Sequence, residues 1–146
     1  MEIINRKARY DYVIYDIYEC GIVLKGTEIK SIRNGQCNLK DSYGIVRNNE
    51  VFLLNMFISK YKEASIFNED ETRTRKLLLH KNEIKKIFND IKLKGVTMVP
   101  LRVYFKGSKV KIELGVCKGK KNFDKRETIK ERDLTREMKK SMKNRY

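Results

Sequence analysis

Four apolar runs with the character of β-strands dominate the first four fifths of the chain. Residues 10–24 are rich in Tyr, Val and Ile at both alternating positions, which predicts a strand covered on both faces. A second run occupies residues 51–58. The third and fourth, residues 98–105 and 110–116, are joined by the polar segment 106–109, and this spacing predicts a β-hairpin.

Two segments carry helical signals instead. Residues 26–35 are short, with Thr27 as a candidate N-cap and Gly35 as a candidate terminator. Residues 80–92 place their apolar side chains on one stripe, and Gly95 follows as a stop signal. The sequence therefore predicts a mainly β fold with two flanking helices.

The economical architecture for short strands with basic loops is a small barrel or sandwich on which two helices pack. Oligonucleotide/oligosaccharide-binding (OB) folds are five-stranded barrels of this size. The length of 146 residues suits one domain. Spacing alone leaves other small α+β folds open, so an OB-like barrel is the leading expectation.

Charge changes the picture, because 34 basic residues face only 19 acidic ones and leave a net charge of +15. Such a surplus favours a polyanionic partner, either a nucleic acid or an anionic membrane surface. No stretch approaches the ~20 apolar residues that span a bilayer. The first residues lack a basic-then-apolar leader, so we expect a cytoplasmic protein without a membrane partner.

The charge is unevenly distributed, and it divides the chain into three parts. We read residues 1–10 as a basic arm, 11–117 as the globular body and 118–146 as a basic tail. The tail has twelve basic and five acidic residues and too little aromatic content for a core, so we expect it to be disordered when free. Its apolar residues recur every four positions, which predicts a helix when a polyanion is bound. A permanently solvated tail is the alternative.

Catalytic and metal-binding chemistry is poorly supported by the residues present. The single histidine, His80, lies at the start of a predicted helix, and general acid–base catalysis needs partners that the sequence does not offer. Cys20, Cys37 and Cys117 are widely spaced and form no Cys-x-x-Cys pair, as expected for buried or idle thiols in a reducing cytosol. We expect no enzyme, no metal and no cofactor; a nuclease, the remaining enzymatic alternative, would depend on His80.

Two basic segments are candidates for RNA contact. Arg6, Lys7 and Arg9 lie beside Tyr10, which combines phosphate neutralisation with a ring on which a base can stack. The alternative is a solvated terminus that leads into a core strand. In residues 71–76, alternating arginines would project on one side of an extended chain, where their guanidinium groups can bind phosphates. A charged strand edge that discourages pairing is an equally good explanation.

Five sequence blocks then occur in an order that is far more specific than any one of them. They are NRKAR (5–9), GTEIKSIR (26–33), KDSY (40–43), TRKLLLH (74–80), and GKK followed by DKRETIKER (119–132). Together they resemble the small protein B family, the SsrA-binding proteins that are partners of transfer-messenger RNA in trans-translation. The likeness covers about residues 5–137.

The resemblance implies an OB-type barrel with flanking helices that binds the tRNA-like domain of transfer-messenger RNA. It further implies ribosome rescue: the tail would enter the decoding site and the empty mRNA channel of a stalled small subunit and become helical there. Elongation factor Tu would take part indirectly, through the aminoacylated RNA. No covalent bond would change. A general RNA-binding or structural ribosomal protein is the alternative that charge and tail fit equally well.

Carried over by position, the family's RNA-binding surface includes Asn5, Glu19 and Leu78. Asn5 can hydrogen-bond a base or sugar edge, Glu19 can accept from base amino groups, and Leu78 can supply an apolar face. The residues themselves suggest further contacts, most of them to phosphates: Arg6, Lys7, Arg9, Tyr10, Lys30, Arg33, Arg73, Arg75 and Lys76.

In the tail, the resemblance points to a ribosome-binding segment that begins at the decoding-centre block. Phe123 stands where other members carry His or Tyr, and Leu134 stands where Trp is frequent. The predicted ribosome-binding residues are Gly119, Lys120, Lys121, Phe123, Asp124, Lys125, Arg126, Ile129, Lys130, Arg132, Leu134 and Met138.

Overall fold

The computed structural model describes residues 2–60 and 70–120, and strands predominate in them. The strands are β1 (Glu2–Ile4), β2 (Tyr12–Ile22), β3 (Cys37–Asn38), β4 (Tyr43–Arg47), β5 (Glu50–Leu54), β6 (Phe57–Ile58), β7 (Arg75–Leu78), β8 (Thr97–Lys106) and β9 (Lys109–Gly119). The helices are α1 (Ala8–Asp11), α2 (Gly26–Arg33) and α3 (Lys81–Lys94). The mainly β prediction is confirmed.

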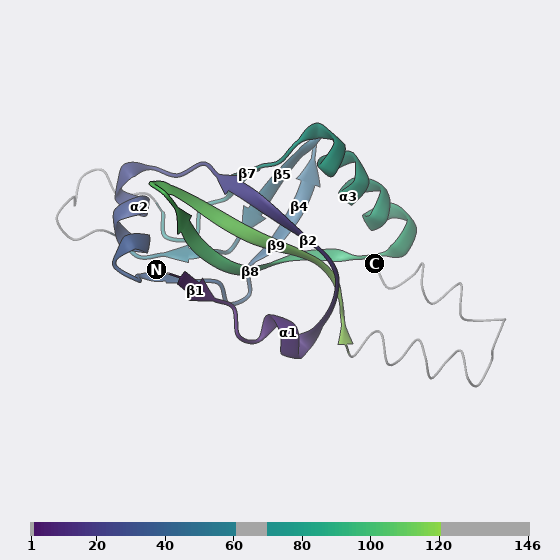
Figure 1. Ribbon diagram of the computed structural model, residues 1–146, viewed down its shortest axis with the longest axis horizontal. Helices are drawn as coiled ribbons and strands as arrows, with labels where there is room; N and C mark the ends of the chain where they lie inside the picture. Colours follow the sequence, from purple (N-terminus) through teal and green to yellow (C-terminus); the bar gives the residue numbers. More distant parts are fainter. Residues whose placement is uncertain (1, 61–69, 121–146) are drawn as a thin grey trace.

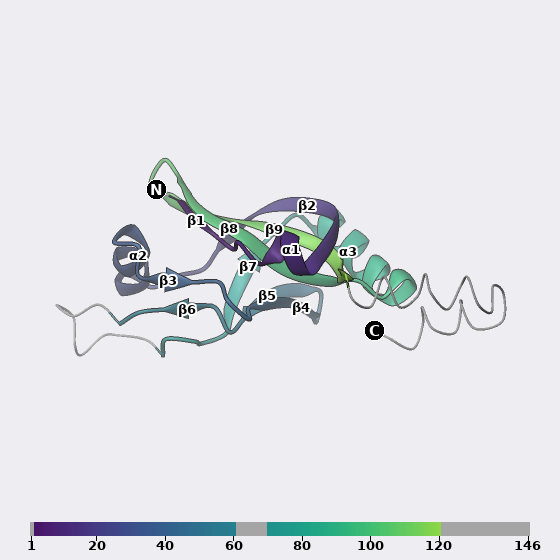
Figure 2. The ribbon, with the colours of Figure 1, turned by 90° about the horizontal axis from the view of Figure 1, so that it is seen from below.

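Within the described residues, the large sheet closes on itself into a barrel. Its order is β1-β8-β4-β5-β7-β2-β9, and β9 also pairs with β8, so the last strand returns to an earlier one. All pairings are antiparallel. In Figure 2, β2, β8 and β9 form one wall, β4 and β5 form the opposite wall, and β7 crosses between them. Closure of this kind removes most sheet edges, and the OB-like expectation is confirmed.

The predicted hairpin is the longest element of the barrel. β8 and β9 pair from Thr97–Cys117 to Lys106–Lys109 through a two-residue Gly-Ser turn, in which Gly107 has a φ of +66° that favours glycine. A β-bulge interrupts the pairing between Pro100 and Arg102. Such a bulge bends the strand, and here it receives the N-terminal segment of the chain.

Two apolar clusters hold the barrel together. The larger one fills the interior with buried side chains such as Ile32, Leu53, Ile87 and Ile112. The smaller one lies outside, where Ala8 of α1 packs against Val99, Leu101 and Cys117 of the bulged hairpin. Residues 2–11 are therefore packed onto the barrel through β1 and α1 (Figure 1).

The expectation for residues 10–24 needs correction. The strand begins at Tyr12, and Tyr10 belongs to α1. From the middle of β2 onward the outward side chains are exposed, with Tyr15 at 51% and Ile17 at 43%, whereas Tyr18 and Cys20 are buried. The strand is thus well covered on one face only, because β2 is part of the barrel wall and its outward side chains there remain largely exposed, although the Lys118 ammonium lies over the Tyr15 ring.

The two predicted helices exist, and they lie at opposite ends of the barrel (Figure 1). α3 begins after His80, whose backbone N–H donates to Glu83 Oε1 at 3.0 Å, and it ends at Gly95 in the left-handed conformation. α2 starts two residues earlier than the predicted cap implies, because Lys25 and not Thr27 is its N-cap. The Lys25 N–H donates to Glu28 Oε1 at 2.8 Å.

Candidate nucleic-acid interface

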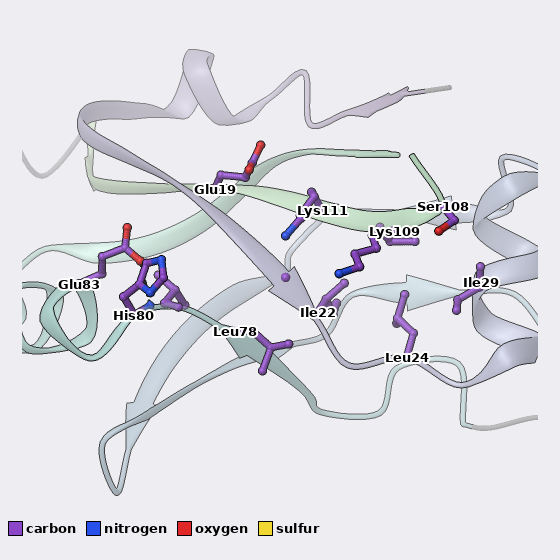
Figure 3. Close-up of a pocket in the computed structure, with 13 residues that line it drawn as sticks. Glu19, Ile22, Leu24, Ile29, Leu78, His80, Glu83, Ser108, Lys109 and Lys111 are labelled. Atoms are coloured by element: carbon purple, nitrogen blue, oxygen red, sulfur yellow. Dashed lines mark hydrogen bonds between the residues drawn. The ribbon is translucent and has the colours of Figure 1, made fainter. Parts of the chain in front are cut away.

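One hollow in the described part of the barrel is a groove of about 760 Å³, defined here as the β2–β7 groove. It is bounded by β2, the start of α2, β7, the start of α3 and the β8–β9 hairpin (Figure 3). Pairing of Gly21 with Leu78 brings the two central strands together. A Cβ on Gly21 would stand 3.3 Å from the Leu78 side chain, so the absence of a side chain permits this close approach.

The β2–β7 groove combines an apolar surface with flanking charges. Leu24, Ile29 and Leu78 line it, and Leu78 is 50% exposed although it is a leucine in a strand. Lys109 and Lys111 line it from β9, and their side chains extend from β9 toward β2 (Figure 3). An unstacked base can rest on such an apolar surface while adjacent ammonium groups neutralise its phosphates.

Glu19, at the rim of the groove, already has two partners on β8. It accepts a hydrogen bond from the Tyr104 hydroxyl and another from Lys106 Nζ at 3.2 Å. These bonds lower the pKa of the Glu19 carboxyl. Burial and the bond to Glu19 raise the pKa of Tyr104 to about 12. Glu19 is therefore ionised at neutral pH, and it orients a cation and a tyrosine beside the groove.

Asn5 lies elsewhere, in a second cleft of about 450 Å³ that we call the α1 cleft. Its backbone N–H donates to Leu101 O at 2.8 Å and its side-chain amide to Pro100 O at 2.9 Å. Both bonds secure the chain on the bulge of β8. The structure thus brings Glu19 and Leu78 into one groove but does not place Asn5 with them.

The basic residues after Asn5 follow it to this side of the molecule. Arg6 and Lys7 line the α1 cleft and are exposed. Arg9 is exposed beside them, and Tyr10 is 79% exposed on α1. All four side chains are thus accessible to a partner, as the sequence predicts for RNA contacts.

The prediction that Arg75 contacts phosphates is wrong. Its side chain is completely buried, with Nε donating to Glu28 Oε2 at 2.8 Å and Nη1 donating to Met56 O at 2.6 Å. Arg73 also binds Glu28, through Nε at 3.0 Å and Nη2 at 2.7 Å. A buried guanidinium needs a partner for its charge, and a carboxylate on α2 supplies it here.

The other predicted contacts in the body are on the surface. Lys30 and Arg33 are exposed on α2, and the Arg33 guanidinium lies 4.6 Å from the centre of the Phe105 ring. Lys76 forms an ion pair with Glu50. Each is accessible to a polyanion, although Lys76 has an acidic neighbour that competes for it.

Of the tail, the structure describes only the beginning. Gly119 pairs with Tyr12 as the last residue of β9, and Lys120 is exposed. The remaining predicted ribosome-binding residues lie outside the described residues: Lys121, Phe123, Asp124, Lys125, Arg126, Ile129, Lys130, Arg132, Leu134 and Met138.

Reactive and metal-binding groups are scarce in the described residues. Burial raises the pKa of the Cys20, Cys37 and Cys117 thiols to about 12 in each case, so they remain protonated at neutral pH. In the part of the chain described, no cluster of three or more His, Cys, Asp and Glu side chains could hold a metal ion. None of the described helices is long and apolar enough to cross a membrane.

Sequence reasoning missed two cations of the β2–β7 groove. Lys109 and Lys111 alternate with the buried Val110 and Ile112, so the period of two along β9 places both ammonium groups on the outer face. That alternation is visible in the sequence. The sequence does not show that the two lysines lie near Leu78, because this proximity depends on the pairing of β2 with both β9 and β7.

Comparison with known proteins agrees with this geometry. The SmpB protein family model matches residues 2–144. SsrA-binding proteins of Clostridium acetobutylicum and Acetivibrio thermocellus are 55% and 57% identical, covering 96% and 97% of this chain and 90% and 92% of theirs.

A solved structure described as "tmRNA-SmpB: a journey to the center of the bacterial ribosome" gives a TM-score of 0.69 at 42% identity. The match covers 82% of this chain and 84% of the other chain. Family model, relatives and fold all agree over most of the chain. The chain belongs to the SmpB protein family.

Proposed function

We propose that this protein is the RNA-binding adaptor of trans-translation: it binds the tRNA-like domain of transfer-messenger RNA and delivers that RNA to stalled ribosomes. The observation that carries the proposal is the β2–β7 groove, in which Leu78 and Glu19 lie beside Lys109 and Lys111. Relatives over 50% identical are named SsrA-binding proteins, and the solved structure is named for transfer-messenger RNA and the ribosome.

The groove is suited to an unstacked nucleotide from a folded RNA loop. Its base would lie on Leu78, Glu19 would accept from an amino group at the base edge, and the two lysines would face the phosphates. Arg6 and Lys7 of the α1 cleft would neutralise further phosphates on another side of the barrel. Contacts on two sides favour a structured RNA over a single extended strand.

We further propose that residues 118–146 act at the decoding centre and in the empty mRNA channel. Their surplus of basic residues suits ribosomal RNA. The protein would work in the cytoplasm and catalyse no covalent step, and elongation factor Tu would join only through the aminoacylated RNA.

The proposal is tested by binding of purified protein to transfer-messenger RNA across a salt series, with bulk tRNA as competitor. Replacing Lys109 and Lys111 together by Gln should weaken binding and reduce the slope of log affinity against log salt by about 2. The matched control replaces Lys92 and Lys94, at the far end of α3, by Gln and should leave the slope nearly unchanged. Equal competition by bulk tRNA would instead favour a general RNA-binding protein.

A chain that ends at Lys120 extends the same test to the tail. Its affinity for transfer-messenger RNA should stay close to that of the full chain, whereas tagging of nascent proteins on stalled ribosomes should be lost. Loss of RNA binding would show that the tail, and not the barrel, holds the RNA.

A further inference from the structure

A buried carboxylate on α2, next in sequence to Ile29 of the β2–β7 groove, joins two arginines. Glu28 is only 4% exposed, and it accepts hydrogen bonds from Arg73 at 2.7 and 3.0 Å, from Arg75 at 2.8 Å and from the Lys25 N–H at 2.8 Å. Neither residue of the pair Glu28–Arg75 reaches bulk water. These charges are therefore paired within the fold, where they hold α2 and residues 73–75 in a fixed relative position.

This cluster ties together the two segments that carry the apolar walls of the groove. Arg73 Nη2 donates to Val23 O at 3.4 Å, and the Val23 N–H donates to Lys76 O at 2.9 Å. Hydrogen bonds and ion pairs thus connect residues 23–28 to residues 73–76. The first segment contains Leu24 and is followed by Ile29, which form one apolar wall, and the second segment is followed two residues later by Leu78 of the other wall.

We propose that Glu28 is a positioning residue for RNA binding: by holding Arg73 and Arg75, it sets the spacing between the wall of Leu24 and Ile29 and the wall of Leu78. This inference rests on the proposed function of the groove. In this proposal the two arginines do not contact phosphates of the RNA, because their guanidinium groups already bind a carboxylate of the protein itself. A change in that spacing would alter how a flat base fits between the walls.

Replacement of Glu28 by Gln distinguishes phosphate contact by the arginines from positioning of the groove by Glu28, because the two roles predict opposite changes in RNA affinity. If the arginines contact phosphates, losing their acidic partner frees positive charge, so RNA affinity rises and its salt dependence steepens. If Glu28 positions the groove, affinity of the folded protein falls by about tenfold while the salt slope is unchanged. Tighter binding or a steeper slope would overturn the proposal.

Replacement of Arg73 by Lys guards against a Glu28 variant that fails to fold, because it leaves the Glu28–Arg75 pair intact. Lys keeps the charge but cannot reproduce two N–H bonds in one plane. We expect affinity to fall several-fold with an unchanged slope; wild-type affinity would contradict a positioning role. Arg47→Gln, an exposed arginine of β4, controls for the general effect of one positive charge and should bind nearly as wild type.

A measurement without RNA keeps this inference distinct from the proposed function. Methyl NMR signals of Leu24, Ile29 and Leu78 should shift in the Arg73→Lys protein, whereas those of Val99, in the separate cluster under α1, should not. Unchanged groove signals would overturn the positioning role. If wild-type protein failed to bind transfer-messenger RNA, the proposed function would be wrong. The methyl signals would still show whether Arg73 positions the walls of the groove.

Discussion

The β2–β7 groove and the α1 cleft are two hollows on one barrel, and each has basic side chains in its lining, yet different interactions hold their walls in place. The groove depends on a buried ion cluster, in which Glu28 satisfies Arg73 and Arg75. The cleft depends on hydrogen bonds of Asn5 to backbone carbonyls at a β-bulge and on a small apolar cluster around Ala8.

The difference teaches where each surface is vulnerable. A buried charge that loses its partner is costly, because water cannot replace the missing interaction. A hydrogen bond at a partly exposed site can be replaced by water, so its loss costs less. The groove should therefore respond strongly to a substitution that removes one of its buried charges, and the cleft only mildly to the loss of one hydrogen bond.

The largest effect is expected from Arg75→Met, which keeps much of the side-chain volume but removes the buried cation. Glu28 loses one donor, and the Met56 and Glu71 carbonyls lose theirs. Urea unfolding should show a loss of about 3 kcal/mol. The control Arg47→Met, at an exposed position, should stay within about 0.5 kcal/mol of wild type. A loss below about 1 kcal/mol would remove the contrast between groove and cleft.

A smaller effect is expected in the cleft from Asn5→Ala. The variant removes the side-chain bond to Pro100 O but keeps the backbone bond to Leu101 O. Unfolding should cost about 1 kcal/mol less than in wild type, since solvent can reach the freed carbonyl. The comparison would fail if Asn5→Ala destabilised the protein as much as Arg75→Met.

The smallest effect is the change of stability with pH, which we expect only on the acid side, below about pH 5. Burial opposes ionisation of Glu28, but hydrogen bonds from Arg73, Lys25 and Arg75 outweigh it and hold the pKa below the ordinary 4.5. Its contribution to stability is complete above that value and declines as the pH falls through the lower folded-state pKa. The stability difference between wild type and Glu28→Gln should therefore be constant from pH 7 to about 5 and shrink below. A difference that grew on acidification would have the wrong sign.

Local elements were largely predictable from the sequence. The 97–119 hairpin follows from two alternating runs around a Gly-Ser turn, and α3 follows from its apolar stripe between His80 and Gly95. Family membership followed from ordered motifs. These features depend on neighbours within a few residues, or on patterns that can be read along the chain.

Contacts between distant segments could not be predicted in this way. Arg73 and Arg75 lie in a basic stretch that resembles a phosphate-binding segment. Only the fold shows that both arginines bind Glu28, a residue more than forty positions earlier in the chain. Likewise Asn5 was grouped with Glu19 and Leu78, whereas the bulge in β8 draws it to another side.

The sequence by itself determined the charge, the mainly β character and the residues available for binding RNA. The tertiary structure alone decided which cations face outward and which form ion pairs in the interior, since a charge can be buried only where the fold brings it an opposite charge. It also decided that Lys109 and Lys111, rather than Arg75, flank Leu78, because barrel closure places β9 and β7 on either side of β2.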